Sequence, residues 1–106
     1  MQDNVSAFRD YLQKEKNYSP HTVTAYLDDI GFFSDYLKKE YDTDRLEEVG
    51  YAQVRSWIVS LVDGGISNSS VNRKISSLKS FYKFLLKIKQ ITASPLLKHK
   101  SLKTPK

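Results

Sequence analysis

Apolar residues recur at every third or fourth position along most of the chain, in four stretches separated by polar or glycine-containing segments. Residues spaced in this way share one face of an α-helix, so each stretch predicts a helix with a buried side. We expect helices at about residues 4–14, 20–39, 51–62 and 68–89. No alternation of apolar and polar residues is long enough to predict a sheet. The predicted fold class is therefore all-α, a four-helix bundle.

The inner faces of these helices form the expected core. They hold Val5, Phe8, Tyr11 and Leu12; Val23, Tyr26, Leu27, Ile30, Phe33 and Leu37; Val54, Trp57, Ile58 and Leu61; and Val71, Ile75, Leu78, Phe81, Tyr82, Phe84, Leu85, Leu86 and Ile88. Gly31 lies inside the second helix, where glycine costs roughly 1 kcal/mol relative to alanine. Close packing of another helix across Gly31 is the expected reason for it.

Local signals indicate where the helices begin and end. Ser19 is the expected N-cap of the second helix, with Pro20 at the first helical position, where proline loses only a spare donor. Gly64 and Gly65 end the third helix, because glycine can adopt the left-handed cap conformation. Ser67 is the expected N-cap of the fourth helix.

The helical pattern stops after Thr92. Residues 93–106 contain two prolines, four lysines and few large side chains, which is typical of a linker. We therefore expect a helical domain at residues 1–92 and a flexible basic C-terminal tail at residues 93–106, ordered only where something binds it.

Composition excludes several classes of function. The chain has 106 residues and no cysteine, which excludes a disulfide framework, a thiol nucleophile and a cysteine-based zinc site. Its two histidines, His21 and His99, lie far apart in the sequence, so we expect no metal site. The apolar runs are too short to span a membrane, and the first residues lack the order of a signal peptide. These features predict a cytoplasmic domain without membrane contact.

Charge is strongly polarised along the chain. Residues 1–65 hold all 12 acidic residues and seven basic ones, a net charge of −5. Residues 66–106 hold ten basic residues and no acidic one, a net charge of +10. Such polarity predicts a polyanionic partner. The alternative is a solvated basic helix followed by a basic tail.

On a helical wheel of the fourth helix, polar residues gather opposite the apolar stripe and cover about a third of the circumference. Lysine and arginine on this acid-free face could contact phosphates, and asparagine or arginine could read base edges. A helix built only for solubility normally mixes both signs of charge. The candidate DNA-contacting residues of this face are Asn72, Arg73, Ser76, Lys79, Ser80, Lys83 and Lys87.

The start of the second helix is a further candidate for phosphate contact. Ser19, His21, Thr22 and Thr24 lie near a helix N-terminus, where backbone N–H groups attract anions. Alternatively, Ser19 and Thr22 only cap the helix.

Nothing in the sequence converges on a catalytic centre. The chain has no glycine-rich phosphate loop, no nucleophile elbow and no metal-ligand spacing, so we expect no catalytic residue and no small-molecule ligand in it. A rival hypothesis makes the chain a protein–protein interaction module of a larger helical assembly. In that case Phe32, Tyr36 and Phe84 form an exposed docking patch, and the lysines serve only solubility.

Two stretches resemble the tyrosine recombinase and phage integrase family. Residues 18–30, YSPHTVTAYLDDI, resemble the S-x-x-T-x-x-x-Y-x-x-D opening of that family's second helix. Residues 69–85, SSVNRKISSLKSFYKFL, resemble its R-x-[LI]-S-x-L-[RK]-x-F-[YF] helix. Residues 94–95 lie where the family often has Asn-Pro, and residues 102–106 look like the linker that precedes the catalytic domain. The resemblance covers nearly the whole chain and is closest to Xer-type recombinases, XerC-type more than XerD-type.

The resemblance implies a SAM-like orthogonal bundle, the core-binding domain that forms one half of a C-shaped clamp around duplex DNA. Its second and fourth helices would face the major groove. The domain would also contact other recombinase protomers bound to the same DNA. Lys79 lies where relatives commonly have arginine, and lysine keeps the charge but loses the bidentate fork. The contacts carried over from the family are Ser19, His21, Thr22, Thr24, Arg73, Lys79 and Lys83.

The family's catalytic arginine, lysine, histidines and tyrosine nucleophile have no counterpart in this sequence. We therefore expect the chain to be a fragment of a longer recombinase. The resemblance implies that the intact protein cuts and joins DNA through a phosphotyrosine link, with no metal or nucleotide cofactor.

Overall fold

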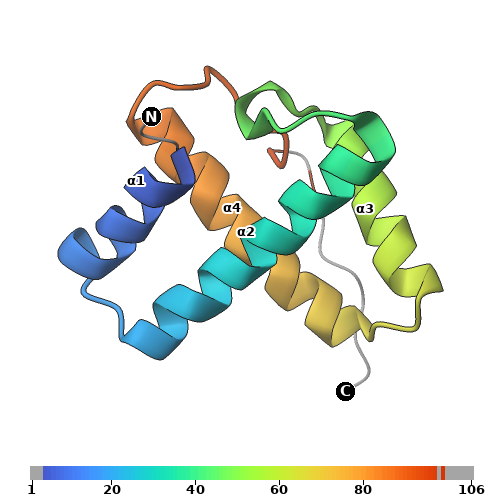
Figure 1. Ribbon diagram of the computed structural model, residues 1–106, viewed down its shortest axis with the longest axis horizontal. Helices are drawn as coiled ribbons and strands as arrows, with labels where there is room; N and C mark the ends of the chain where they lie inside the picture. Colours follow the sequence, from blue (N-terminus) through green and yellow to red (C-terminus); the bar gives the residue numbers. More distant parts are fainter. Residues whose placement is uncertain (1–3, 98, 100–106) are drawn as a thin grey trace.

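The computed structural model describes residues 4–97 and 99. These residues form four α-helices and no strand: α1 (Asn4–Asp10), α2 (Pro20–Tyr41), α3 (Tyr51–Asp63) and α4 (Asn68–Lys87). A π-helical turn, η1 (Tyr11–Glu15), continues α1, and a short 3-10 helix, η2 (Leu46–Glu48), precedes α3. Figure 1 shows α2 and α4 crossing at the centre, with α1 near one end and α3 near the other. The predicted all-α, four-helix fold is confirmed.

The predicted helix starts are confirmed by their hydrogen bonds. Ser19 Oγ accepts from the backbone N–H of Thr22 at 3.3 Å, and Ser67 Oγ accepts from that of Ser70 at 3.2 Å. Gly65 follows α3 with φ of +92°, a conformation that glycine adopts without strain. The local capping signals therefore placed α2, α3 and α4 to within about two residues of their observed ends.

The core lies where the inner faces of the four helices meet. Phe8, Phe33 and Tyr82 are among its largest fully buried side chains. Burying one large apolar side chain stabilises a fold by about 1.5–3 kcal/mol. The aromatic rings pack edge to face or tilted, as between Phe8 and Phe81 at 5.3 Å between centroids. No helix in the described residues is both long enough and apolar enough to cross a membrane.

Three expectations about packing are wrong. Gly31 is exposed, and no heavy atom lies within 4 Å of the place a Cβ would take, so no helix packs across it. Leu86 and Ile88 are exposed at the end of α4 and do not point inward. Ile88 follows the last helical residue and so no longer shares the helix's inner face.

The exposed aromatic patch of the rival hypothesis does not form as expected. Phe84 is buried, with its ring centroid 4.9 Å from that of Tyr11 in η1. Tyr36 is half-buried, and its hydroxyl is hydrogen-bonded to Ser56 of α3. Phe84 is buried because α1 covers the part of α4 that carries it. Of the three aromatic residues, only Phe32 is strongly exposed.

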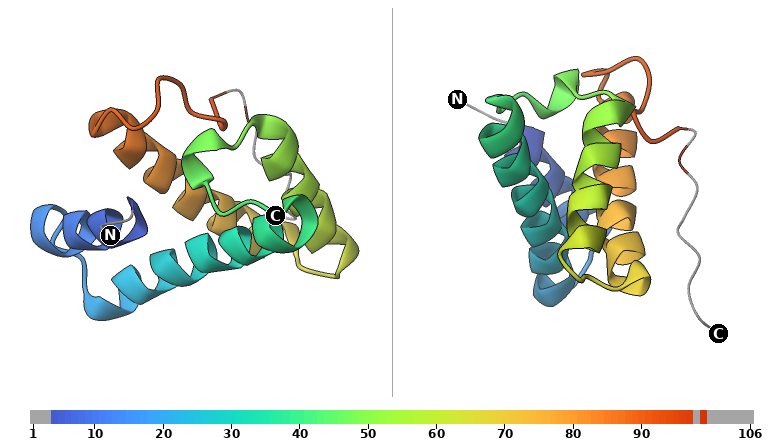
Figure 2. Two further views of the ribbon diagram at one scale, coloured as in Figure 1. Left: turned by 45° about the horizontal axis from the view of Figure 1, so that its top comes forward. Right: turned by 90° about the vertical axis from the view of Figure 1, so that its right-hand side faces the viewer.

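The core extends beyond the domain boundary expected at residue 92. Leu96, four positions after that boundary, is buried among the core residues. His99 Nδ1 lies 3.3 Å from the Tyr51 hydroxyl at the start of α3. Figure 2 shows the segment after α4 running back over the bundle towards α3. The predicted tail at residue 98 and at residues 100–106 lies outside the described residues.

Candidate nucleic-acid interface

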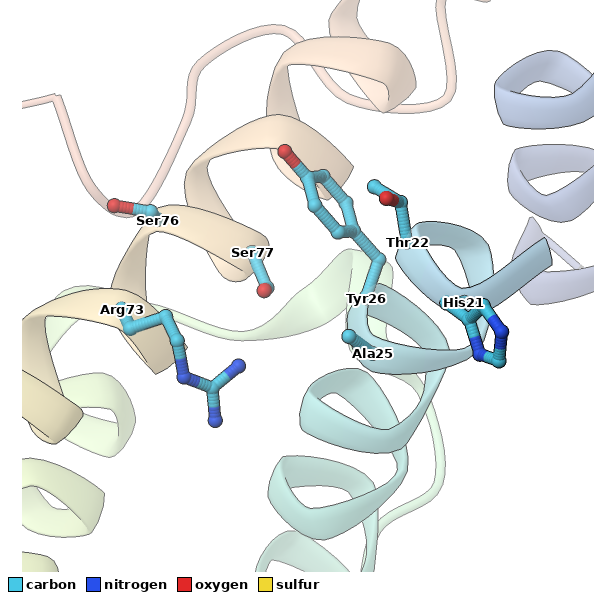
Figure 3. A pocket seen from close by; sticks show the side chains of 7 residues that line it. All are labelled: His21, Thr22, Ala25, Tyr26, Arg73, Ser76 and Ser77. Carbon is cyan, nitrogen blue, oxygen red and sulfur yellow. The ribbon is translucent and has the colours of Figure 1, made fainter. Parts of the chain in front are cut away.

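The first turns of α2 and the first half of α4 lie side by side and enclose a shallow hollow. It has a volume of about 330 Å³. Its lining, shown in Figure 3, is His21, Thr22, Ala25 and Tyr26 from α2 and Arg73, Ser76 and Ser77 from α4. The two surfaces predicted separately along the sequence are therefore parts of one surface in the fold.

A buried carboxylate holds the two helices together beside this hollow. The Asp29 side chain of α2 is 2% exposed. Arg73 donates to both of its oxygens, from Nη1 to Oδ2 at 2.9 Å and from Nη2 to Oδ1 at 3.4 Å. Ser77 Oγ donates to Oδ2 at 2.7 Å, and Lys74 Nζ to Oδ1 at 3.4 Å. A buried carboxylate is costly unless it is paired and hydrogen-bonded, and these four contacts satisfy that requirement.

The basic face of α4 is thus acid-free in sequence but not in the fold. Asp29 neutralises part of the charge at its N-terminal half, and Glu15 Oε1 lies 3.5 Å from Lys87 Nζ near its C-terminal end. Both side chains of the second pair are more than half exposed, so that contact contributes little to stability. Lys79 and Lys83 are exposed and form no ion pair with any described residue.

The residues of the predicted face do not all point in one direction. Arg73 and Ser76 line the hollow beside α2. Lys79 lies near His99, and the pKa of His99 is lowered by burial of its ring and by the charge of Lys79. Asn72 is half-buried, and the Ser76 hydroxyl donates to its carbonyl oxygen at 3.1 Å. The C-terminal segment therefore approaches one edge of the predicted face, and α2 approaches the other.

A larger groove continues from the hollow along the second half of α4. It has a volume of about 480 Å³, and Tyr26 lines both spaces. Its other lining residues are Phe8, Tyr11, Leu12, Lys16, Tyr18, Ser80, Lys83, Phe84, Leu86 and Lys87. Three of the predicted contact residues, those at positions 80, 83 and 87, are thereby joined to the hollow.

The groove also contains residues that the sequence prediction missed. Lys16 and Tyr18 lie just before α2. Tyr26, expected in the core, is half-buried against it and also lines both spaces. Lys16 Nζ and Lys87 Nζ lie 5.9 Å and 4.8 Å from the centre of the Tyr11 ring. Lysines among aromatic rings are typical of nucleic-acid-binding surfaces. Proximity to Ser19 was the available signal for Lys16 and Tyr18, but only the fold brings them to α4.

The remaining predicted residues at the start of α2 have more local surroundings. Ser19 caps the helix, and its Oγ lies 3.0 Å from Thr22 Oγ1, so the capping role is observed directly. Thr24 is exposed and lines neither the hollow nor the groove. His21 is exposed at the rim of the hollow. No group of three or more histidine or acidic side chains in residues 4–97 and 99 is arranged to hold a metal ion.

Comparison with known proteins gives a consistent result. The tyrosine recombinase XerC of Anoxybacillus flavithermus is 42% identical over 86% of this chain and 30% of its own length. The XerC of Oceanobacillus iheyensis is 39% identical over 96% of this chain and 33% of its own, and that of Bacillus subtilis is 38% identical over 86% and 30%. The chain thus spans about a third of the length of these curated relatives. No solved structure matches it.

A family model also matches most of the chain. Residues 5–89 match the model described as "Phage integrase, N-terminal SAM-like domain". They include both sequence stretches on which the resemblance was based, and the helical fold agrees with that family. The predicted resemblance is confirmed, and the chain belongs to the family of phage integrase N-terminal SAM-like domains.

Proposed function

We propose that this chain is the DNA-gripping N-terminal domain of a tyrosine site-specific recombinase. The observation that carries the proposal is the joining of the α2 and α4 surfaces into one hollow and groove with basic residues along them. Membership of the integrase family and the XerC relatives support it. The intact recombinase would cut and join duplex DNA in the cytoplasm together with other protomers, and this chain would supply grip and register.

Each type of residue on this surface has a distinct proposed task. Lys79, Lys83 and Lys87 contact phosphates, which position a protein on DNA without reading its sequence. Arg73 and Asn72 are proposed to read base edges, since arginine and asparagine can bond bidentately to guanine and adenine. Small hydroxyl side chains allow the DNA backbone to approach closely. They are those of Ser76 and Ser80 and of the threonines at the start of α2. Because phosphate contacts release counterions, affinity should fall steeply as salt rises.

A titration of duplex DNA at two salt concentrations tests the proposal. Affinity should drop markedly between about 50 mM and about 200 mM salt. The double variant Lys79→Glu/Lys83→Glu should lose low-salt binding and keep its helical circular dichroism spectrum. The matched control is Lys38→Glu/Lys39→Glu, the same charge change in the last turn of α2, far from the hollow. Salt-independent binding, or equal losses in both double variants, would reject the proposed surface.

A further inference from the structure

We propose that Asp29 is a positioning residue that holds Arg73 ready for one sequence-selective contact with a base edge of duplex DNA. The proposal rests on the function proposed above and assigns the specificity to one ion pair within it. It concerns a carboxylate that no DNA could touch, because the side chain is 2% exposed.

The position of Asp29 is determined by the interior of the protein. Ser77, which donates to Asp29 Oδ2 at 2.7 Å, is itself buried at 3% exposure. Lys74 adds a contact at 3.4 Å, and its side chain is 14% exposed. The Arg73 side chain is 57% exposed and belongs to the surface. The carboxylate is therefore a fixed anchor, and the arginine is the part that it orients.

The donors of the Arg73 guanidinium divide into two sets. A guanidinium carries five N–H donors in a rigid plane. One N–H of Nη1 and one of Nη2 face Asp29. On the adjacent edge, the Nε–H and the second Nη2–H point in parallel, and neither has a partner among the described residues. Two parallel N–H donors match the O6 and N7 acceptors of guanine in the major groove. Asp29 thus uses one fork of the arginine and leaves the other available.

The fixed orientation of Arg73 determines whether it contacts any nearby phosphate or one particular base. An exposed arginine that is free to turn can follow whichever phosphate is nearest. Arg73 lines the α4 side of the hollow beside Ser76 and opposite Ala25 of α2, and its guanidinium is held on one side by Asp29. Its free fork can bind only an acceptor pair that arrives at one place. We expect a guanine there to be favoured over other bases.

The charge balance separates this role from a merely structural one. Asp29 with Arg73 and Lys74 carries a net charge of +1, and Asp29→Asn raises it to +2. General attraction to DNA should therefore stay equal or increase in that variant, while the base preference is lost. A purely structural role would instead lower stability and leave the base preference of the folded fraction unchanged.

Selection from a randomised duplex library followed by sequencing provides the test. The wild-type chain should enrich guanine at one position by about tenfold, as one bidentate contact predicts. Asp29→Asn and Arg73→Lys should both reduce that enrichment to near one at the same position. Lys83→Gln is the control, because it removes an exposed charge and should weaken binding to all sequences with the preference retained. An unchanged preference in Asp29→Asn, or no preference in the wild type, overturns the proposal and leaves DNA binding standing. Absence of binding by the wild type overturns the proposed function as well.

A second measurement needs no variant, so it stands if Asp29→Asn does not fold. In NMR relaxation of the free wild-type chain, the Arg73 Nε–Hε vector should be ordered, and its resonance should shift when DNA is added. Arg55 of α3 is the internal reference, since it is exposed and forms no ion pair with a described residue. Equal disorder at the two arginines would overturn the proposal.

Discussion

The hydroxyl of Tyr82 in α4 donates a hydrogen bond to the carbonyl oxygen of Leu46 in η2 over 2.8 Å. The two residues are 36 positions apart, and both are buried. Burial raises the pKa of Tyr82, and the nearby charge of Glu47 raises it further. The contact anchors the connection between α2 and α3 to the centre of the molecule.

Tyr82→Phe should destabilise the fold by about 1 kcal/mol, because it removes the shorter of the two hydrogen bonds that the buried Leu46 carbonyl accepts and leaves only the one from the Val49 N–H at 3.4 Å. Urea unfolding followed by circular dichroism measures the change. Tyr41→Phe is the matched control, since Tyr41 is 43% exposed, and its effect should stay within about 0.5 kcal/mol. Equal stabilities of the two variants would show that the Tyr82 hydroxyl contributes nothing.

Gly31→Ala should raise the free energy of unfolding by roughly 0.5–1 kcal/mol, because the residue lies in an exposed helix interior with space for a Cβ. Gly65→Ala is the contrasting change and should destabilise by about 1–2 kcal/mol, because φ there is +92°. Thermal unfolding of both variants checks the opposite signs. A loss of stability in Gly31→Ala would mean that something packs on this position after all.

Glu15→Gln should strengthen DNA binding at low salt by releasing Lys87, whose Nζ lies 3.5 Å from the Glu15 carboxylate. The plot of log affinity against log salt concentration should become steeper, by up to about the amount expected for one additional phosphate contact. Stability should change little, because both partners are exposed. Asp35→Asn removes the same charge at an exposed position of α2 that forms no ion pair with a described residue, and it gives the baseline. Equal gains in the two variants would assign the effect to overall charge.

Titration of His99 should give a pKa below its ordinary value of 6.5, because burial and the charge of Lys79 both disfavour the imidazolium. The pKa of His99 is lower in the folded chain than in the unfolded chain. As the pH falls below about 6.5, the unfolded chain therefore takes up the proton first, and the contribution of His99 to the free energy of unfolding decreases. Lys79→Gln should move the pKa of His99 upward, whereas Lys83→Gln should leave it unchanged. NMR titration of the ring protons measures all three values. An unchanged pKa in Lys79→Gln would place Lys79 away from the C-terminal segment.

The sequence was sufficient for everything that depends on neighbours along the chain. Helical spacing predicted the inward positions of Phe33 and Leu78, because residues three and four apart share a face whatever the rest of the fold does. Ser19 and Ser67 marked helix starts, because a cap bonds to the N–H only a few residues ahead. The family resemblance also depended on two short stretches, and it is confirmed.

The same reasoning could not determine which side chains meet across helices. Nothing in the sequence pairs Asp29 with Arg73, which is a candidate for reading base edges, yet the crossing of α2 and α4 joins these residues 44 positions apart. Phe84 fitted either a core or a docking patch until the position of α1 decided for the core.

The chain's own pattern of residues thus determined its helices, their capped ends and its family, since each of these rests on spacing within a few turns or on short motifs. Only the tertiary structure decided which charges of α4 remain exposed and which are neutralised. The reason is physical: the strength of a charge at the surface depends on the burial and distance of groups that the crossing of helices brings from elsewhere in the chain.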